Sequence, residues 1–188
     1  MQKAKQRSEI AQQDKWRIED IYATDEAWEA DYNECIRRAK EKCVYQGRLA
    51  ESAQILYQAL KESDEADLLV EHVYVYAFMK YYEDTANAVY QEMSGRAQAA
   101  VTKLSEKYAF LTPEILAIDQ KKMQEYLNSD TLALYCHALE DILAKKEHAL
   151  SEKEERLLAM AGQVTASPNE IFSCLLYTSD AADDLTRV

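Results

Sequence analysis

Proline and glycine, the two residues that most often interrupt helices, are almost missing from this chain. Of its 188 residues only two are proline and three are glycine, and the first proline is Pro113. Nothing in the first half therefore forbids long helices. With 48% hydrophobic and 30% charged residues, the composition is that of a soluble globular protein. The sequence predicts an all-α fold of consecutive antiparallel helices.

Start signals divide the first half of the chain into four expected helices. Thr24, followed by two acidic residues, predicts the start of the first, and Gly47 a break after it. A second helix is expected around Ile55, and Ser63 with Asp64 predicts the start of a third. The first helix should bury one face, formed at helical spacing by Trp28, Tyr32, Cys35, Ile36, Ala39 and Cys43.

The stretch from Val73 to Met79 is rich in β-branched and aromatic residues and alone would pass for a buried strand. No Gly or Pro occurs between Arg48 and Ser94, so the length of the uninterrupted pattern favours a helix buried on most sides. The fourth helix should contain Gly95, which we interpret as a close helix crossing. Its stripe consists of Tyr90, Met93, Ala97, Ala100, Val101, Leu104 and Tyr108.

Further starts follow in the second half. Thr112 as N-cap and Pro113 as the first helical residue predict one helix, and Ser129 or Asp130 opens another that carries Leu132, Tyr135, Leu139, Ile142 and Leu143. Two capping boxes then predict two more helices. They pair Ser151 with Glu154 and Ser167 with Glu170.

Charge and hydropathy exclude several classes of partner. The net charge of −12 argues against nucleic acid or an anionic membrane as the main partner. The longest apolar run, Val73 to Met79, is too short to span a bilayer, and the charged start lacks the apolar core of a secretory signal. Cys35, Cys43 and Cys136 have no paired spacing, which favours reduced thiols packed in a core. We expect a cytoplasmic location.

No residue can be assigned to catalysis, cofactor binding or metal binding. The histidines, His72, His137 and His148, do not form His-Glu-x-x-His, and there is no phosphate-binding glycine loop, nucleophile elbow or cysteine zinc pattern. We interpret the histidines as surface or interhelical contacts. Asp20 and Asp84 are candidates for buried capping or interhelix hydrogen bonds.

Thirteen tyrosines are more than expected, and five of them cluster within 17 residues: Tyr74, Tyr76, Tyr81, Tyr82 and Tyr90. Amphipathic packing, with hydroxyls reaching the surface, explains such a cluster. The alternative interpretation is a wet aromatic wall beside a peptide groove.

The last fifteen residues, 174–188, do not resemble the rest of the chain. The run from Cys174 to Asp183 resembles a translated adapter used in sequencing libraries, which predicts that the native reading frame is lost at about Ser173. We therefore expect residues 1–173 to be a truncated helical domain and residues 174–188 to be a non-native tail. A natural acidic tail is the alternative.

Several short motifs occur in an order that resembles the amino-terminal region of the oligoendopeptidase F family, relatives of the thimet-type zinc oligopeptidases. They are Trp16-x-Ile18-x-Asp20-Ile21-Tyr22 with Trp28, Gly47-x-Leu49, Tyr76-Ala77, Asp84-Thr85, Tyr90-Gln91, Phe110-x-x-Pro113-Glu114-Ile115 and His148-x-Leu150-Ser151-x-x-Glu154-Glu155-x-Leu157-Leu158. The resemblance extends from about Arg7 to Ser173.

The resemblance implies an intact enzyme several times longer, almost wholly helical, that degrades short peptides in an internal channel. It implies zinc in that parent, a zinc-bound water that attacks the scissile bond, and a His-Glu-x-x-His motif downstream of this region. This part would form a wall of the channel and contact the missing carboxy-terminal catalytic domain. By itself it should bind no zinc and cleave nothing. The alternative is a free-standing acidic helical module for protein interactions.

Overall fold

The structure, a computed structural model, describes residues 9–144 of the 188, and the compact unit that holds nearly all of them runs to Ile142. Within residues 9–144 there are helices and no strands, so the predicted all-α class is confirmed. Six α-helices follow two short 3-10 turns, Gln12–Asp14 and Ile18–Asp20. The helices are α1 (Asp25–Lys40), α2 (Ala53–Glu83), α3 (Ala88–Tyr108), α4 (Leu111–Ala117), α5 (Gln120–Leu127) and α6 (Cys136–Ala144), with the 3-10 helix η4 (Asp130–Tyr135) leading into α6.

Helix α1 starts where the sequence predicts. The Thr24 hydroxyl oxygen accepts a hydrogen bond from the backbone N–H of Ala27 at 3.3 Å, and acidic residues fill the first turn. Trp28 and Cys35 are buried on the predicted face. The helix ends at Lys40, so the prediction that Cys43 lies on the same helix is wrong. Both thiols are nevertheless free and buried, as predicted.

A cluster of charged side chains stabilises the last turns of α1. The Arg37 guanidinium donates to Glu34 at 2.6 Å and that of Arg38 at 2.8 Å. The hydrogen bond from Arg37, which has the larger effect, and the one from Arg38 lower the pKa of Glu34 from 4.5 to about 2.

We expect Glu34→Gln to lower the free energy of unfolding by up to about 1 kcal/mol at pH 7. The effect is small because the ion pairs of Glu34 with Arg37 and Arg38 are partly exposed to solvent. A carboxylate with a lowered pKa stabilises the fold above its unfolded pKa of 4.5, and this contribution is lost as the pH falls toward 2. Urea unfolding at pH 7, 4 and 2.5 should show the two proteins converging. Glu92→Gln, which removes an exposed α3 carboxylate, is the control. Curves that stay equally far apart at every pH would contradict the role of the arginines.

Helix α2 is one continuous helix of 31 residues. The predicted start of a new helix at Ser63 is wrong, because Ser63 is 9% exposed and lies on the buried stripe. That stripe alternates three- and four-residue steps without interruption, as in helices that pack side by side. It consists of Leu56, Ala59, Ser63, Ala66, Val70, Val73 and Ala77. The helical interpretation of Val73–Met79 is confirmed, and every residue of that stretch is buried or half-buried.

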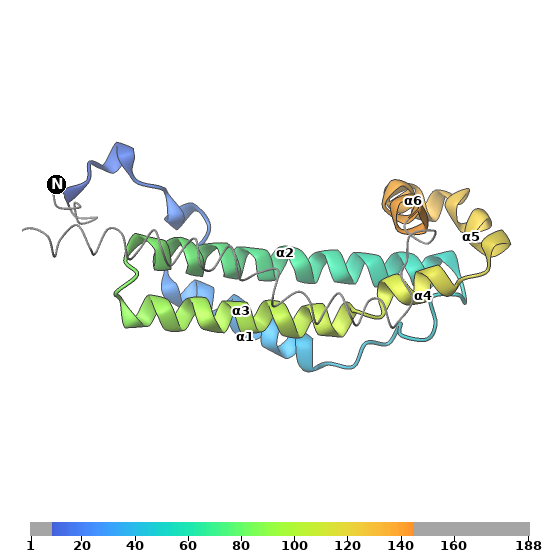
Figure 1. Cartoon of the computed structure of the whole chain (residues 1–188), viewed down its shortest axis with the longest axis horizontal. Helices are drawn as coiled ribbons and strands as arrows, with labels where there is room; N and C mark the ends of the chain where they lie inside the picture. Colours follow the sequence, from blue (N-terminus) through green and yellow to red (C-terminus); the bar gives the residue numbers. More distant parts are fainter. Residues whose placement is uncertain (1–8, 145–188) are drawn as a thin grey trace, which may run out of the picture. The chain divides into compact units, whose positions relative to one another are not determined.

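Helices α1, α2 and α3 pack against one another, and α2 runs antiparallel to both α1 and α3 (Figure 1). The predicted stripe of α3 supplies its buried residues Met93, Ala97, Ala100, Leu104 and Tyr108. Asn87 caps α3, with its side-chain oxygen accepting from the backbone N–H groups of Val89 and Tyr90.

Gly95 does not mark a close helix crossing, contrary to the prediction. It is exposed, and a Cβ built there would meet nothing within 4 Å. We expect Gly95→Ala to stabilise the protein by about 1 kcal/mol, because alanine loses less backbone entropy in a helix. Thermal unfolding followed by circular dichroism measures this gain. Gly47→Ala is the matched control and should destabilise, since Gly47 has φ +82° in a turn. An unchanged or lower melting temperature for Gly95→Ala would contradict the expectation.

The predicted start at Thr112 is displaced by two residues. Helix α4 begins at Leu111 after Phe110, so Thr112 does not cap it and Pro113 is its third residue. Helix α5, capped by the Asp119 carboxylate, was not predicted. The start at Ser129 or Asp130 is confirmed, although its first turns are the 3-10 helix η4 and only then α6. η4 packs against α2 and α5.

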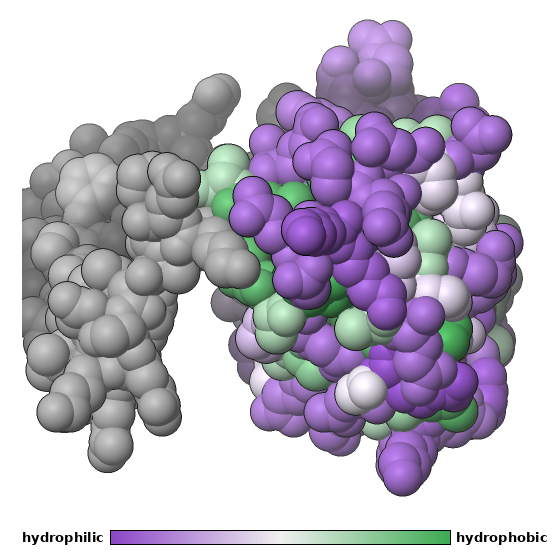
Figure 2. All heavy atoms as spheres, turned by 90° about the vertical axis from the view of Figure 1, so that its right-hand side faces the viewer, coloured by the Kyte–Doolittle hydropathy of each residue, from purple (hydrophilic) through white to green (hydrophobic). Residues whose placement is uncertain are grey.

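Figure 2 views the molecule from the end where α4, α5 and α6 lie, and this face is mostly hydrophilic, with scattered apolar residues. His148, the two predicted capping boxes and the predicted tail lie outside the described residues.

Candidate functional site

The residues that could carry metal chemistry do not come together. His72 and His137 are both exposed, on α2 and α6. His137 lies 3.8 Å from the Asp141 carboxylate one turn later, a surface contact of the predicted kind. Within residues 9–144, no group of three or more His, Cys, Asp or Glu side chains could hold a metal ion.

The two aspartates expected to make buried contacts do not. Asp20 is exposed and pairs with Arg17 at 2.8 Å. Asp84 follows the end of α2 and is also exposed, where its carboxylate accepts from the backbone N–H of Ala86 at 3.2 Å. Both predictions of burial are wrong. Each aspartate instead stabilises a local turn at the surface, where water already solvates its charge.

The tyrosine cluster of α2 is divided between two faces of the helix. Tyr76 belongs to the core, whereas Tyr74, Tyr81 and Tyr82 surround Phe78. The rings of Tyr74 and Phe78 stack with centroids 4.2 Å apart, and Tyr82 is 67% exposed. We call Tyr74, Phe78, Tyr81 and Tyr82 the aromatic face of α2. It combines large apolar area with hydroxyl groups, which suits contact with another polypeptide.

Tyr76 takes part in a polar site where α1, α2 and α3 meet. Its hydroxyl donates to the Asp25 carboxylate at 2.8 Å, and Lys80 forms an ion pair with the same carboxylate. The Lys80 ammonium also lies 5.0 Å from the ring centre of Tyr76 and 5.2 Å from that of Tyr90. Burial alone would raise the pKa of Asp25, but the hydrogen bonds from Lys80 and Tyr76 lower it. All the charges in this site have partners, so it holds the helices together.

A second polar site joins the other ends of the same helices. The Lys107 ammonium donates to the Arg38 carbonyl at 3.0 Å and to Glu62 at 3.4 Å, and the Tyr108 hydroxyl donates to Glu62 at 3.0 Å. The Lys107 side chain is only 7% exposed. Burial, then the hydrogen bond to Glu62, raises the pKa of Tyr108. The Lys107 ammonium group is therefore used in contacts that hold the three helices together.

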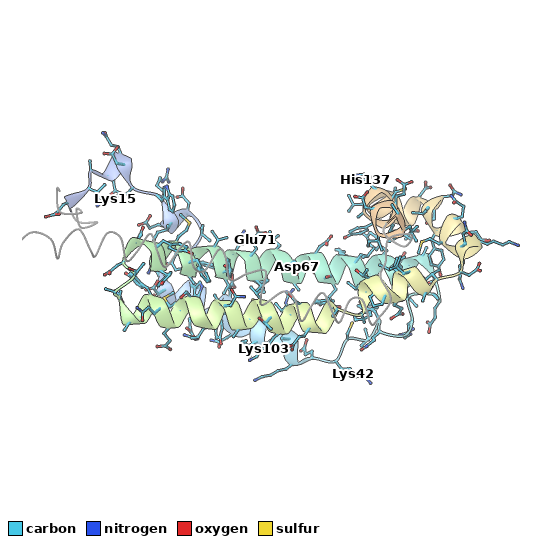
Figure 3. The ribbon with its side chains drawn as sticks, in the orientation of Figure 1. Lys15, Lys42, Asp67, Glu71, Lys103 and His137 are labelled. Atoms are coloured by element: carbon cyan, nitrogen blue, oxygen red, sulfur yellow. The ribbon has the colours of Figure 1, made fainter. Side chains whose placement is uncertain are left out.

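Beside Lys107 lies an open groove of about 650 Å³ between the segment after α1 and the carboxy-terminal part of α3. Its charged lining includes Lys42, Lys103 and Glu106, and its apolar lining includes Cys43 and Phe110. Figure 3 shows Lys42 and Lys103 on the same side of the unit, one from the segment after α1 and the other from α3. We call it the lysine groove. Sequence reasoning missed it, because its lysines are 61 positions apart and nothing in the pattern links them.

Comparison with known proteins gives consistent results. Residues 114–179 match the family model described as Oligopeptidase F. Oligopeptidase PepF of Bacillus subtilis is 40% identical over 170 residues, covering 90% of this chain and 25% of the relative. The oligoendopeptidase F homolog of Lactococcus lactis subsp. lactis is 40% identical over 174 residues, covering 90% and 28%. The chain thus spans about a quarter of the length of the curated relatives it matches.

Solved structures show the same fold. Oligoendopeptidase-F from Enterococcus faecium superposes with a TM-score of 0.65 and 29% identity, over 80% of this chain and 29% of that one. A putative peptidase from Chlamydophila abortus superposes with a TM-score of 0.71 over 90% of this chain and 29% of that one, at 24% identity. The resemblance inferred from short ordered motifs is confirmed. None of the helices described between residues 9 and 144 has the length and apolar character needed to cross a membrane.

Proposed function

Since this chain corresponds to the amino-terminal region of the oligoendopeptidase F family, we propose that it is part of a longer zinc-dependent peptidase that hydrolyses short peptides. The observation that carries the proposal is the 40% identity with an oligopeptidase over 90% of this chain. Short peptides and the remainder of the longer polypeptide would be its partners. The free, buried thiols of Cys35 and Cys43 agree with a location in the reducing cytoplasm.

Zinc does not fit the residues that the structure describes. Its usual ligands are three or four His, Cys, Asp or Glu side chains around one point, and residues 9–144 bring no such set together. Because the full sequence also lacks His-Glu-x-x-His, we assign metal binding and the catalytic residues to the part of the longer protein that this chain does not contain. The prediction that this chain itself cleaves no peptide follows from that assignment.

The role proposed for this region is to form a wall of the substrate channel. The aromatic face of α2 supports it, because Tyr82 presents a largely exposed ring beside the stacked Tyr74 and Phe78. Rings of this kind contact peptide backbones and side chains without selecting one sequence. The long α2 and α3 helices give that face a rigid backing, held by the polar sites at Lys80 and Lys107.

The proposal is tested at the level of the gene and then of the protein. Sequencing across the codon for Ser173 should reveal a continuing frame that encodes His-Glu-x-x-His. The product should cleave internally quenched short peptides, lose activity with a chelator and regain it with zinc. A stop codon after Val188, together with a compact 188-residue monomer that binds no hydrophobic dye, would refute the peptidase proposal. That result would favour the free-standing acidic helical module.

A further inference from the structure

The lysine groove contains cations that the fold does not use. Lys42 and Lys103 are exposed, and no ion pair among residues 9–144 includes either. Lys107, by contrast, is occupied by Arg38 and Glu62. Glu41 at the rim is neutralised by its ion pair with Arg37. Glu106, on the same lining, is in no ion pair among residues 9–144 either, so the groove presents two ammonium groups and one carboxylate that the fold does not pair.

Part of the groove's lining is apolar. This part consists of Cys43, which is 9% exposed, and of Phe110, Ala39 and Ala109. Two ammonium groups and several apolar side chains on one lining suit a ligand that joins a carboxylate to a hydrophobic group. It does not suit a polyphosphate or a nucleic acid, whose several negative charges would need more cations than these two lysines.

We propose that the lysine groove binds the carboxy-terminal residue of a short peptide. The α-carboxylate would contact Lys42 and Lys103, and an apolar final side chain would pack on Phe110 and Cys43. The Glu106 carboxylate, on the same lining, can accept a hydrogen bond from a peptide N–H. This inference rests on the proposed peptidase function and deepens it by assigning a place that holds one end of a peptide.

The test is a titration of the ¹⁵N-labelled 188-residue chain with N-acetyl-Ala-Ala-Leu, once as the free acid and once as the carboxamide. Shifts of backbone resonances should concentrate at Cys43, Phe110 and their neighbours. The free acid should bind at least about tenfold more tightly than the amide, because the amide lacks the charge that both lysines contact. The double variant Lys42→Gln/Lys103→Gln should weaken binding of the acid to the level of the amide.

Lys121→Gln is the matched control, because it removes an exposed charge on α5, outside the groove. It should leave the affinity unchanged, and circular dichroism should show that every variant keeps its helix content. Equal affinity for acid and amide, shifts located elsewhere, or no binding at all would overturn the proposal. These outcomes are distinct from failure of the peptidase proposal, because equilibrium binding to this chain requires no turnover and no zinc.

Discussion

Replacing Trp28 with alanine is expected to destabilise the protein by about 3–5 kcal/mol, the largest effect of any single substitution considered for this chain. Trp28 is 1% exposed, and its indole N–H donates to the Val73 carbonyl of α2 at 2.8 Å. Its ring stacks on Tyr32, and the Arg96 guanidinium from α3 lies 5.2 Å from its centre. One side chain thus joins α1 to both longer helices, and its removal leaves a cavity between all three.

Denaturant unfolding followed by circular dichroism measures this loss. Trp28→Phe keeps a large part of the ring and should cost clearly less than Trp28→Ala. Trp16→Phe should change stability by less than about 1 kcal/mol, because Trp16 is 64% exposed. Since the chain has two tryptophans, Trp16→Phe also leaves Trp28 as the only source of tryptophan fluorescence. Its emission should be that of a buried indole, and an emission typical of exposed indole would contradict the packing of α1.

Replacing Glu114 with alanine should cost about 2 kcal/mol, because hydrogen bonds to a charged group are stronger than those between neutral groups. The Glu114 carboxylate, from α4, accepts from the backbone N–H of Gly47 at 2.9 Å and of Leu49 at 2.7 Å. Leu49 is fully buried, so these bonds fix the turn that delivers it to the core. Without them two backbone donors in the loop between α1 and α2 lose their partner.

Hydrogen exchange gives a local reading of the same interaction. The amides of Gly47 and Leu49 should exchange slowly in the parent and much faster in Glu114→Ala. Glu114→Gln retains one acceptor oxygen without the charge and should lie between the two. Glu125→Ala, which removes an exposed carboxylate of α5, should change stability by no more than about 0.5 kcal/mol. Unchanged exchange at Leu49 in Glu114→Ala would show that the loop is held by other contacts.

Local signals account for the parts of the fold that the sequence predicted. Thr24 forms its cap through a neighbouring backbone N–H, and Gly47 adopts the positive φ that glycine favours, so both could be predicted from local sequence. Ser63 shows the limit of such signals: a serine before two acidic residues resembles a helix start, and only its place on a continuous buried stripe shows otherwise. Helix α5 could have been found from Asp119 followed by Met123 and Tyr126, which are buried at helical spacing.

Long-range pairings were beyond sequence reasoning. Nothing in the sequence around Glu114 indicates that its carboxylate accepts from backbone N–H groups more than 60 residues earlier. Asp25 is shared between Tyr76 and Lys80, and Lys42 and Lys103 line one groove. Both arrangements depend equally on the packing of distant helices. The family resemblance could be found from the sequence, because the order of short motifs along the chain is visible without any information on these contacts.

The dependence of α1 on both later helices has a consequence during synthesis on the ribosome. Helix α1 leaves first, but Val73 and Arg96, which its tryptophan contacts, are made only later. At 5–20 residues per second, the roughly 70 residues from Trp28 to Arg96 take about 3 to 14 seconds to add. Helices α2 and α3, linked by four residues, can pair with each other as soon as both have emerged. Until α3 has emerged, the part of α1 that packs on α3 has no partner from its own chain, and a nascent-chain chaperone can bind there.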